Sequence, residues 1–139
     1  MVDIKVQVSA QVSGGPQVSL NQDIKTEAYN KIEVAIQPGD TDKVINVAQG
    51  NKGEISFLLI TSNLYSSEEK LTYKVGDKEI QLDRPQIFLG AGAVSLLGEN
   101  LSQIKFSNKY DKATEEDKPD PNQAEIEILV GRDATPQLT

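Results

Sequence analysis

The reactive groups of this chain are carboxylates, lysines, tyrosines and hydroxyls, because the sequence contains no histidine and no cysteine. Catalytic Ser-His-Asp and Cys-His pairs, thiolate metal sites and disulfides are therefore excluded. A glycoside hydrolase would need two carboxylates facing a cleft, and Glu125 and Glu127 share one face of an expected strand. Alternating glutamates on the outside of a sheet are more simply its hydrated face. We therefore expect no enzymatic activity and no catalytic residues.

Two further patterns resemble ligand sites but match them incompletely. Asp40 with Asp42, and the acidic residues between Asp111 and Asp120, offer oxygen ligands for calcium, but their spacing fits no EF-hand loop. The stretch from Gly90 to Ser95 begins like a dinucleotide-binding loop, although the third glycine and a following helix are missing. Small residues that let strands approach one another explain it better. We expect no cofactor and no metal.

A sugar-binding site would need polar groups beside an aromatic ring, and Asn63 and Tyr65 stand together in a polar loop. The chain has no tryptophan and only 5% aromatic residues, so a stacking platform would be small. A carbohydrate-binding or adhesion module is the alternative to the interpretation favoured below.

The charge of the chain argues against nucleic acid as a partner. The formal net charge is -7, and the two arginines, Arg84 and Arg132, lie outside any basic run. Binding to a phosphate backbone depends on clustered lysine and arginine. The first residues contain no uninterrupted apolar segment, and no stretch is long enough to span a membrane. We therefore expect neither a secretion signal nor a membrane partner.

Apolar residues alternate with polar ones in several segments, which predicts strands. The segment from Glu54 to Ser62 has apolar side chains on both faces and is bounded by turn residues, which is typical of a central strand. The run from Val2 to Val12 is apolar at every even position and nearly twice the usual strand length. Gly14, Gly15 and Pro16 then end it. Short strands are also expected near residues 32–36, 44–47, 86–89 and 124–130.

The clearest local prediction is a hairpin from Lys70 to Asp83 around Gly76-Asp77, since a glycine opening a two-residue loop suits hairpin turns. This register places Tyr73 opposite Ile80 and Lys74 opposite Glu79. Two segments are ambiguous. Residues 21–30 are interpreted as a loop or helical turn, and residues 90–104 fit a short helix or two strands, of which we favour the strands.

These elements predict one all-β domain, an antiparallel β-sandwich or jelly roll of about eight or nine strands. Residues 1–16 would form a long strand or arm, 17–131 the sandwich with a polar loop at 109–123, and 132–139 a tail. The overlong first strand could add itself to the sheet edge of a neighbour, or be an ordinary first strand. The residues expected to contact a partner are Val2, Ile4, Val6, Val8, Val12, Gly14, Gly15, Arg132 and Asp133.

A small acidic β-sandwich without histidine or cysteine, with extended ends and no signal peptide, resembles the capsid cement or decoration proteins of tailed phages. The resemblance rests on this architecture, on the alternating segment Val2 to Val12 and on the tail after Val130. It implies a virion accessory protein, made in the host cytoplasm, that binds neighbouring shell subunits and stabilises the capsid. Self-association through strand addition is a further expectation. From the residues alone, the prediction is a structural or interaction module.

Overall fold

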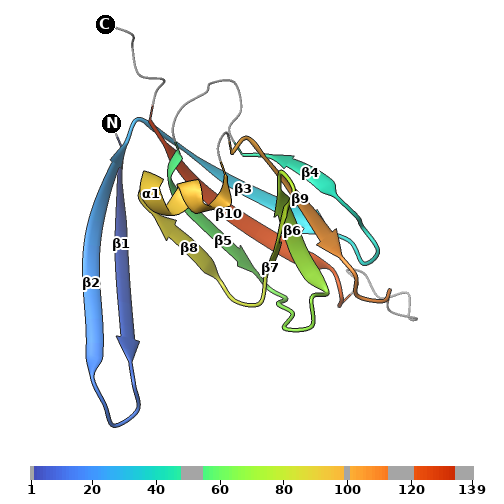
Figure 1. Ribbon diagram of the computed structural model, residues 1–139, viewed down its shortest axis with the longest axis horizontal. Coiled ribbons are helices and arrows are strands. Elements are labelled where there is room, and N and C mark those ends of the chain that lie inside the picture. The colour runs from blue at the N-terminus through green and yellow to red at the C-terminus, as the bar shows by residue number, and fades with distance from the viewer. Residues whose placement is uncertain (1, 48–54, 99–100, 113–120, 134–139) are drawn as a thin grey trace, which may run out of the picture.

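The computed structural model describes residues 2–47, 55–98, 101–112 and 121–133, and these form an all-β protein (Figure 1). All paired strands are antiparallel, which confirms the predicted fold class. Within these described ranges, short helical turns occur between the strands at α1 (Ala91–Val94) and η1 (Ser95–Leu97). The strands are β1 (Val2–Gln11), β2 (Gln17–Thr26), β3 (Ala28–Ile36), β4 (Lys43–Asn46), β5 (Ile55–Ser62), β6 (Leu71–Val75), β7 (Lys78–Gln81), β8 (Gln86–Leu89), β9 (Gln103–Asn108) and β10 (Ala124–Arg132).

Two four-stranded sheets form the sandwich. One has the order β3-β10-β5-β8, and the other has the order β4-β9-β6-β7. The predicted central strand is confirmed, because β5 pairs with β10 on one side and with β8 on the other. On one face of β5, Leu58 and Ile60 have no solvent exposure, and on the other face Phe57 is 2% exposed, so both faces of this internal strand are covered.

The core lies between the two sheets and is built from the alternating apolar side chains. It includes Ile128 of β10 and Ile104 of β9, both fully buried. Tyr73 and Phe106 pack with their ring centroids 5.7 Å apart in a tilted arrangement. The Tyr73 hydroxyl donates a hydrogen bond of 2.5 Å to Gln86 Oε1, so the ring is buried without leaving its polar end unpaired.

The predicted hairpin around Gly76 is confirmed in its register. Tyr73 lies opposite Ile80 and Lys74 opposite Glu79. Gly76 has a φ of 60°, a value that glycine adopts without steric penalty and that the mirror-image turns of tight hairpins need. The backbone amide of Leu82 continues the pairing by donating to the carbonyl of Leu71.

Three expectations about local structure were wrong. Residues 21–30 do not form a loop or helical turn, because β2 continues to Thr26 and β3 begins at Ala28. Ile24 and Ala28 have helical spacing, but each belongs to an antiparallel ladder with a long-range partner. The first half of 90–104 contains α1 and η1, and a strand begins only at Gln103. The last strand extends past Val130 to Arg132, so the tail begins later than expected, and residues 134–139 lie outside the described residues.

The first two strands form a separate two-stranded sheet that projects from one end of the sandwich (Figure 1). The long alternating run is therefore one strand of a hairpin whose second strand is β2. We call residues 2–26 the arm. Residues 113–120 of the polar loop expected at 109–123 lie outside the described residues.

Candidate protein-interaction surface

The arm owes its length to an uninterrupted antiparallel register. Each residue of β1 pairs with one of β2, from Val2 opposite Thr26 to Gln11 opposite Gln17. At the tip, the amide of Val12 donates to the carbonyl of Pro16 at 3.0 Å, and the amide of Gly15 donates to the carbonyl of Val12 at 2.8 Å. Gly14 has a φ of 70°, so a glycine suits this position.

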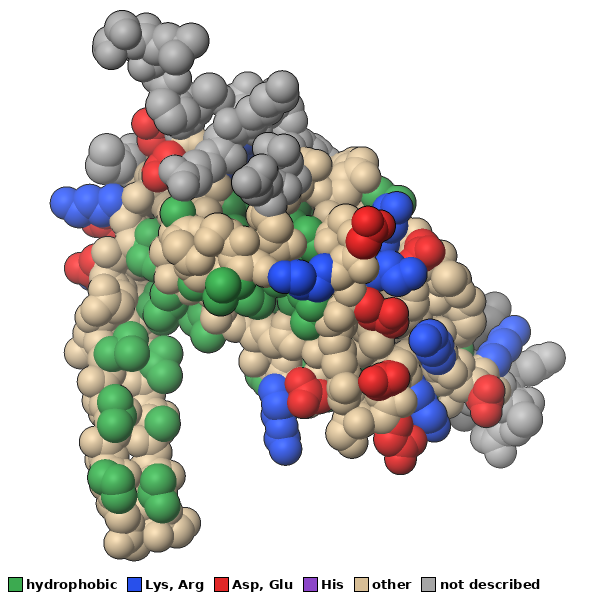
Figure 2. Space-filling view, viewed as in Figure 1, with side chains coloured by type: hydrophobic (Ala, Val, Ile, Leu, Met, Phe, Trp, Pro, Cys, Tyr) green, Lys and Arg blue, Asp and Glu red, His purple; other side chains and the backbone are tan. Residues whose placement is uncertain are grey.

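One face of the arm is apolar and partly exposed toward the tip. The even positions of β1 share this face with Val18, Leu20 and Ile24 of β2, because side chains opposite each other in a ladder lie on the same side. Val8, Val12 and Val18 are 36%, 62% and 67% exposed. Figure 2 shows hydrophobic side chains in pairs along the visible face of the arm. Exposed apolar side chains aligned on one face favour an interaction site more than scattered surface valines do.

The distal arm also carries no charge. Between Lys5 and Asp23 the sequence contains no charged residue, although 25% of the chain is charged. The polar face is made of amides and hydroxyls, with Gln17 Nε2 donating to Ser9 Oγ at 3.0 Å and to Ser19 Oγ at 3.2 Å. The cores of protein interfaces are depleted of charged residues in the same way. The uncharged run covers parts of both β1 and β2 and is visible in the sequence. It could have indicated that the two strands form one surface, and the sequence-based prediction missed it.

At its base the arm packs against the outer face of a sandwich sheet. Gly131 of β10 and Phe57 of β5 are neighbours in that sheet. A Cβ placed on Gly131 would lie 2.6 Å from Ile4 Cδ1, 3.0 Å from Thr26 Cγ2 and 3.2 Å from Phe57 Cβ. The side chains of Ile4 and Thr26 therefore occupy the space that a larger residue at 131 would take. This close contact joins the arm to the sandwich.

The base contact buries apolar residues outside the core between the sheets. Val6 is 8% exposed and Phe57 2% exposed. Thr26 is buried as well, and its Oγ1 has no hydrogen-bond partner among the described residues. The amide of Glu27 donates to the carbonyl of Arg132 at 3.1 Å, which adds a backbone link.

The residues expected to contact a partner thus divide into two groups. Val8, Val12, Gly14 and Gly15 are exposed in the distal arm and its tip. Val2, Ile4 and Val6 are buried or half-buried toward the base, as are Arg132 and Asp133 at the end of β10. In the second group, Ile4 lies against Gly131 and the carbonyl of Arg132 accepts the amide of Glu27, so these two residues help to hold the arm on the sandwich. The first group lies on the exposed part of the arm. Val18 and Leu20 belong to the same surface and were not among the expected residues.

The two residues of the sugar-binding alternative are engaged in holding their own loop. Asn63 Oδ1 accepts a hydrogen bond from the amide of Glu125 at 2.7 Å. The Tyr65 hydroxyl accepts one from the amide of Ser62 at 3.0 Å. These two hydrogen bonds therefore stabilise the end of β5 beside β10.

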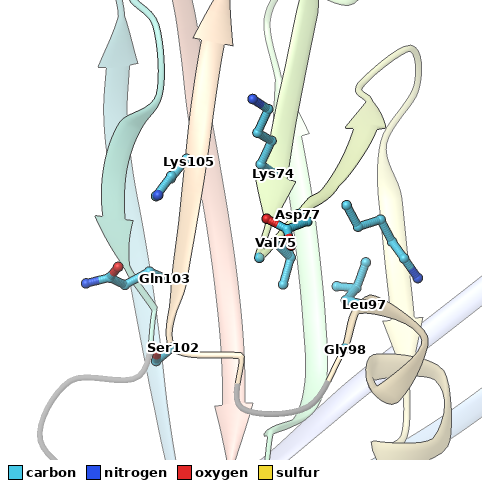
Figure 3. Close-up of a pocket in the computed structure, with 10 residues that line it drawn as sticks. Lys74, Val75, Asp77, Leu97, Gly98, Ser102, Gln103 and Lys105 are labelled. Atoms are coloured by element: carbon cyan, nitrogen blue, oxygen red, sulfur yellow. The ribbon is translucent and has the colours of Figure 1, made fainter.

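A separate hollow of about 490 Å³ lies at the turn between β6 and β7 (Figure 3). Its lining includes Lys74, Lys78 and Lys105, and Lys74 and Lys105 lie opposite each other in the ladder. Figure 3 shows the side chains of these two opposed lysines pointing apart. The Lys74 amino group lies 3.7 Å from Asp42 Oδ1, and that of Lys78 donates to the carbonyl of Leu96 at 2.6 Å. The amino groups do not converge on one position, as an anion site would require.

The described acidic residues that were named as catalytic or metal-binding candidates lie on the protein surface or close turns. Glu125 and Glu127 are exposed on β10. Asp40 Oδ2 accepts the amide of Gln37 at 2.8 Å and so closes a turn. Within residues 2–47, 55–98, 101–112 and 121–133, no group of three or more acidic side chains is arranged to hold a metal ion. In the same part of the chain, no helix has the length and apolar character needed to cross a membrane.

Comparison of the chain with protein-family models, with curated proteins and with solved structures gives no match.

Proposed function

We propose that this chain is a non-enzymatic structural protein that attaches to other protein subunits through its arm. The observation that carries the proposal is the projecting hairpin whose distal part is uncharged and exposes an apolar face. Isolated two-stranded hairpins are only marginally stable in water, and a partner that covers the apolar face would add the missing packing. The sandwich would serve as the rigid body from which the arm reaches out.

We further propose that the partners are the subunits of a virus shell, and that the protein is a capsid cement or decoration protein of a tailed phage. The support is architectural: a small acidic β-sandwich with a projecting arm resembles such accessory proteins. In this role the protein would bind neighbouring shell subunits and strengthen the shell through the surface buried by each arm. The virion would then be its location, with neither membrane nor nucleic acid as a partner.

The test starts from the genes that flank the gene for this chain: a major shell subunit encoded there is assembled into empty shells and mixed with the purified protein. The decisive variant lacks Val8–Gln11 and Gln17–Leu20, which removes four opposite pairs of the arm and keeps the turn. Because an even number of pairs is removed, the remaining side chains keep their faces. We expect the full chain to sediment with the shells and the shortened-arm variant to bind at least about tenfold more weakly, since burial of even one valine contributes about 1.5 kcal/mol or more.

Val18→Asp and Val44→Asp form a matched pair for the same assay. Both valines are exposed strand residues, at 67% and 47%, but Val44 lies on β4 of the sandwich. Val18→Asp should weaken shell binding as the shortened arm does, and Val44→Asp should leave it unchanged. Equal binding by the shortened-arm variant and the full chain would contradict the proposal, as would equal losses from the two aspartate variants. If no shell genes flank the gene for this chain, the proposed capsid role is contradicted. The proposal that the arm binds protein subunits would then be tested with the proteins that the flanking genes encode.

A further inference from the structure

The backbone of the arm has a defined set of outward-facing hydrogen-bonding groups. The hydrogen bond from the amide of Val12 to the carbonyl of Pro16 shows which opposite pairs of the ladder are hydrogen-bonded. In an antiparallel pair, hydrogen-bonded and non-hydrogen-bonded positions alternate. The even residues of the register therefore bond across the arm, and the odd residues point their N–H and C=O groups outward. The outward residues of the distal arm are Gln7, Ser9 and Gln11 on β1 and Gln17, Ser19 and Asn21 on β2.

The outer edge of β2 is the more accessible of the two. In Figure 1, β2 lies on the side of the arm away from the sandwich, while β1 faces it. Proteins usually protect such edges with lysine or other charges, with proline or with bulges. From Gln17 to Gln22 the edge has none of these, and its register with β1 is regular. The first charged residue of β2 is Asp23.

The chemistry of this edge fits a second copy of the same chain. An antiparallel pairing about a two-fold axis at Ser19 would place Gln17 opposite Asn21 and Val18 opposite Leu20. No like charges would meet, because the paired stretch is neutral. The sandwiches carry most of the net charge of -7 and would repel each other if they touched. Contact along the distal part of β2 keeps the two sandwiches apart, and screening over a Debye length of about 8 Å weakens the repulsion that remains.

We propose that two copies of this chain associate through the outer edges of β2, forming a four-stranded antiparallel sheet from two arms. The inference rests on the arm being a contact surface, as proposed above, and adds a second copy as a partner at its edge. The pairing keeps the apolar residues of both arms on one side of the joined sheet. Two apolar faces would then be presented together to a shell subunit.

The dimer should be reversible. One pair of strand edges buries far less than the roughly 800 Å² per partner of a standard stable interface. We therefore expect a concentration-dependent equilibrium between monomer and dimer, and not a fixed dimer. The measurement is sedimentation velocity of the purified full chain, up to about 1 mM, a range that reaches weak dissociation constants.

Proline substitutions at the two edges distinguish the proposed pairing from other contacts. Ser19→Pro removes an outward amide of β2 without breaking the internal ladder, and Ser9→Pro does the same on β1. Each variant also loses a hydroxyl of the Ser9–Ser19 contact, so the pair is matched. We expect Ser19→Pro to raise the dissociation constant of the dimer at least tenfold and Ser9→Pro to change it less than twofold. Circular dichroism should show that both variants keep the sheet content of the full chain.

A chain that remains monomeric up to about 1 mM would overturn the inference. So would a dimer that Ser19→Pro leaves unchanged, or one that both proline variants weaken equally. Val12→Asp distinguishes failure of the dimer from failure of the proposed function, because Val12 lies in the turn after β1 and outside the β2 residues that pair in the dimer. It should reduce shell binding and leave the dimer intact. Ser19→Pro should weaken the dimer at least tenfold while each monomer still binds shells through its apolar face, although with lower avidity.

Discussion

Single side chains of this protein mostly complete backbone hydrogen bonding or fill the core. Asn108 illustrates this role: its Nδ2 donates to the carbonyls of Ile36 and Asn122 at 3.0 and 2.8 Å, and its Oδ1 accepts the amide of Tyr110 at 3.0 Å. One buried amide therefore links the end of β9 to the end of β3 and to the segment before β10. Buried polar groups need such partners, because an unpaired one costs about 1–3 kcal/mol.

Ionisation of Tyr73 should make the fold less stable at alkaline pH. Burial raises the pKa of its hydroxyl above the ordinary value of 10.0, because the charged form would lose its hydration. A raised folded-state pKa contributes stability that is fully present below pH 10.0 and is lost as the pH rises toward the folded value. The free energy of unfolding should therefore fall above about pH 10, by at most about 1.4 kcal/mol per pH unit from this group.

Urea denaturation of the full chain and of Tyr73→Phe between neutral and alkaline pH checks this dependence. At neutral pH, Tyr73→Phe should be less stable by about 1 kcal/mol, because Gln86 Oε1 loses its donor. Above about pH 10 the difference should shrink or reverse, since phenylalanine does not ionise. Parallel losses in both proteins across the whole range would show that Tyr73 is not the group responsible.

At the scale of elements, local signals were enough for some strands and not for others. The two apolar faces of Ile55–Ser62 indicate an internal strand in any all-β fold, and Gly76-Asp77 sets a hairpin with no distant partner. The arm was harder, because Gln22 interrupts the apolar positions of β2 and Ile24 and Ala28 have helical spacing. Its attachment depends on Ile4 lying against Gly131, a contact between opposite ends of the sequence. No local pattern contains that information.

Gly131 should control how firmly the arm is attached. In Gly131→Ala the new Cβ would overlap Ile4 and crowd Thr26 and Phe57. Overpacking of this kind costs about 1–3 kcal/mol, and we expect the free energy of unfolding to fall within that range or the base of the arm to move away. Gly92→Ala is the control, because nothing lies within 4 Å of its added methyl group.

Chemical denaturation measures the stability of both variants, and NMR shifts of the Ile4 methyl groups report on the attachment. Gly131→Ala should shift these signals and Gly92→Ala should not. Unchanged stability together with unchanged Ile4 signals in Gly131→Ala would mean that the arm is not packed on Gly131 as the structure shows.

The candidate surface was predictable in part. The alternation from Val2 to Val12 correctly indicated a strand with one apolar face and placed Val8 and Val12 on the surface now proposed. It did not show that Ile4 and Val6 turn inward at the base, or that Val18 and Leu20 complete the surface. Those facts depend on where the hairpin meets the sandwich, which requires the three-dimensional arrangement.

The whole molecule divides into an acidic sandwich and a neutral distal arm. The sandwich has a continuous core, and its side-chain hydrogen bonds at Asn63, Tyr65 and Asn108 all serve its own structure. The arm exposes valines at its far end and presents outward-facing backbone groups along both edges. In the proposed function, the sandwich supplies stability and the arm supplies association. The core lies in the sandwich, and the exposed apolar surface lies on the arm.

Amide hydrogen exchange of the protein, alone and bound to assembled shells, tests this division most directly. Exchange reports the local opening of backbone hydrogen bonds, so the free distal arm should exchange faster than the strands of the core. On binding, residues 7–21 should become protected while β6, β7 and β9 keep their rates. Protection that appears over the hollow beside Lys74 and Lys105, with no change in the arm, would contradict the account.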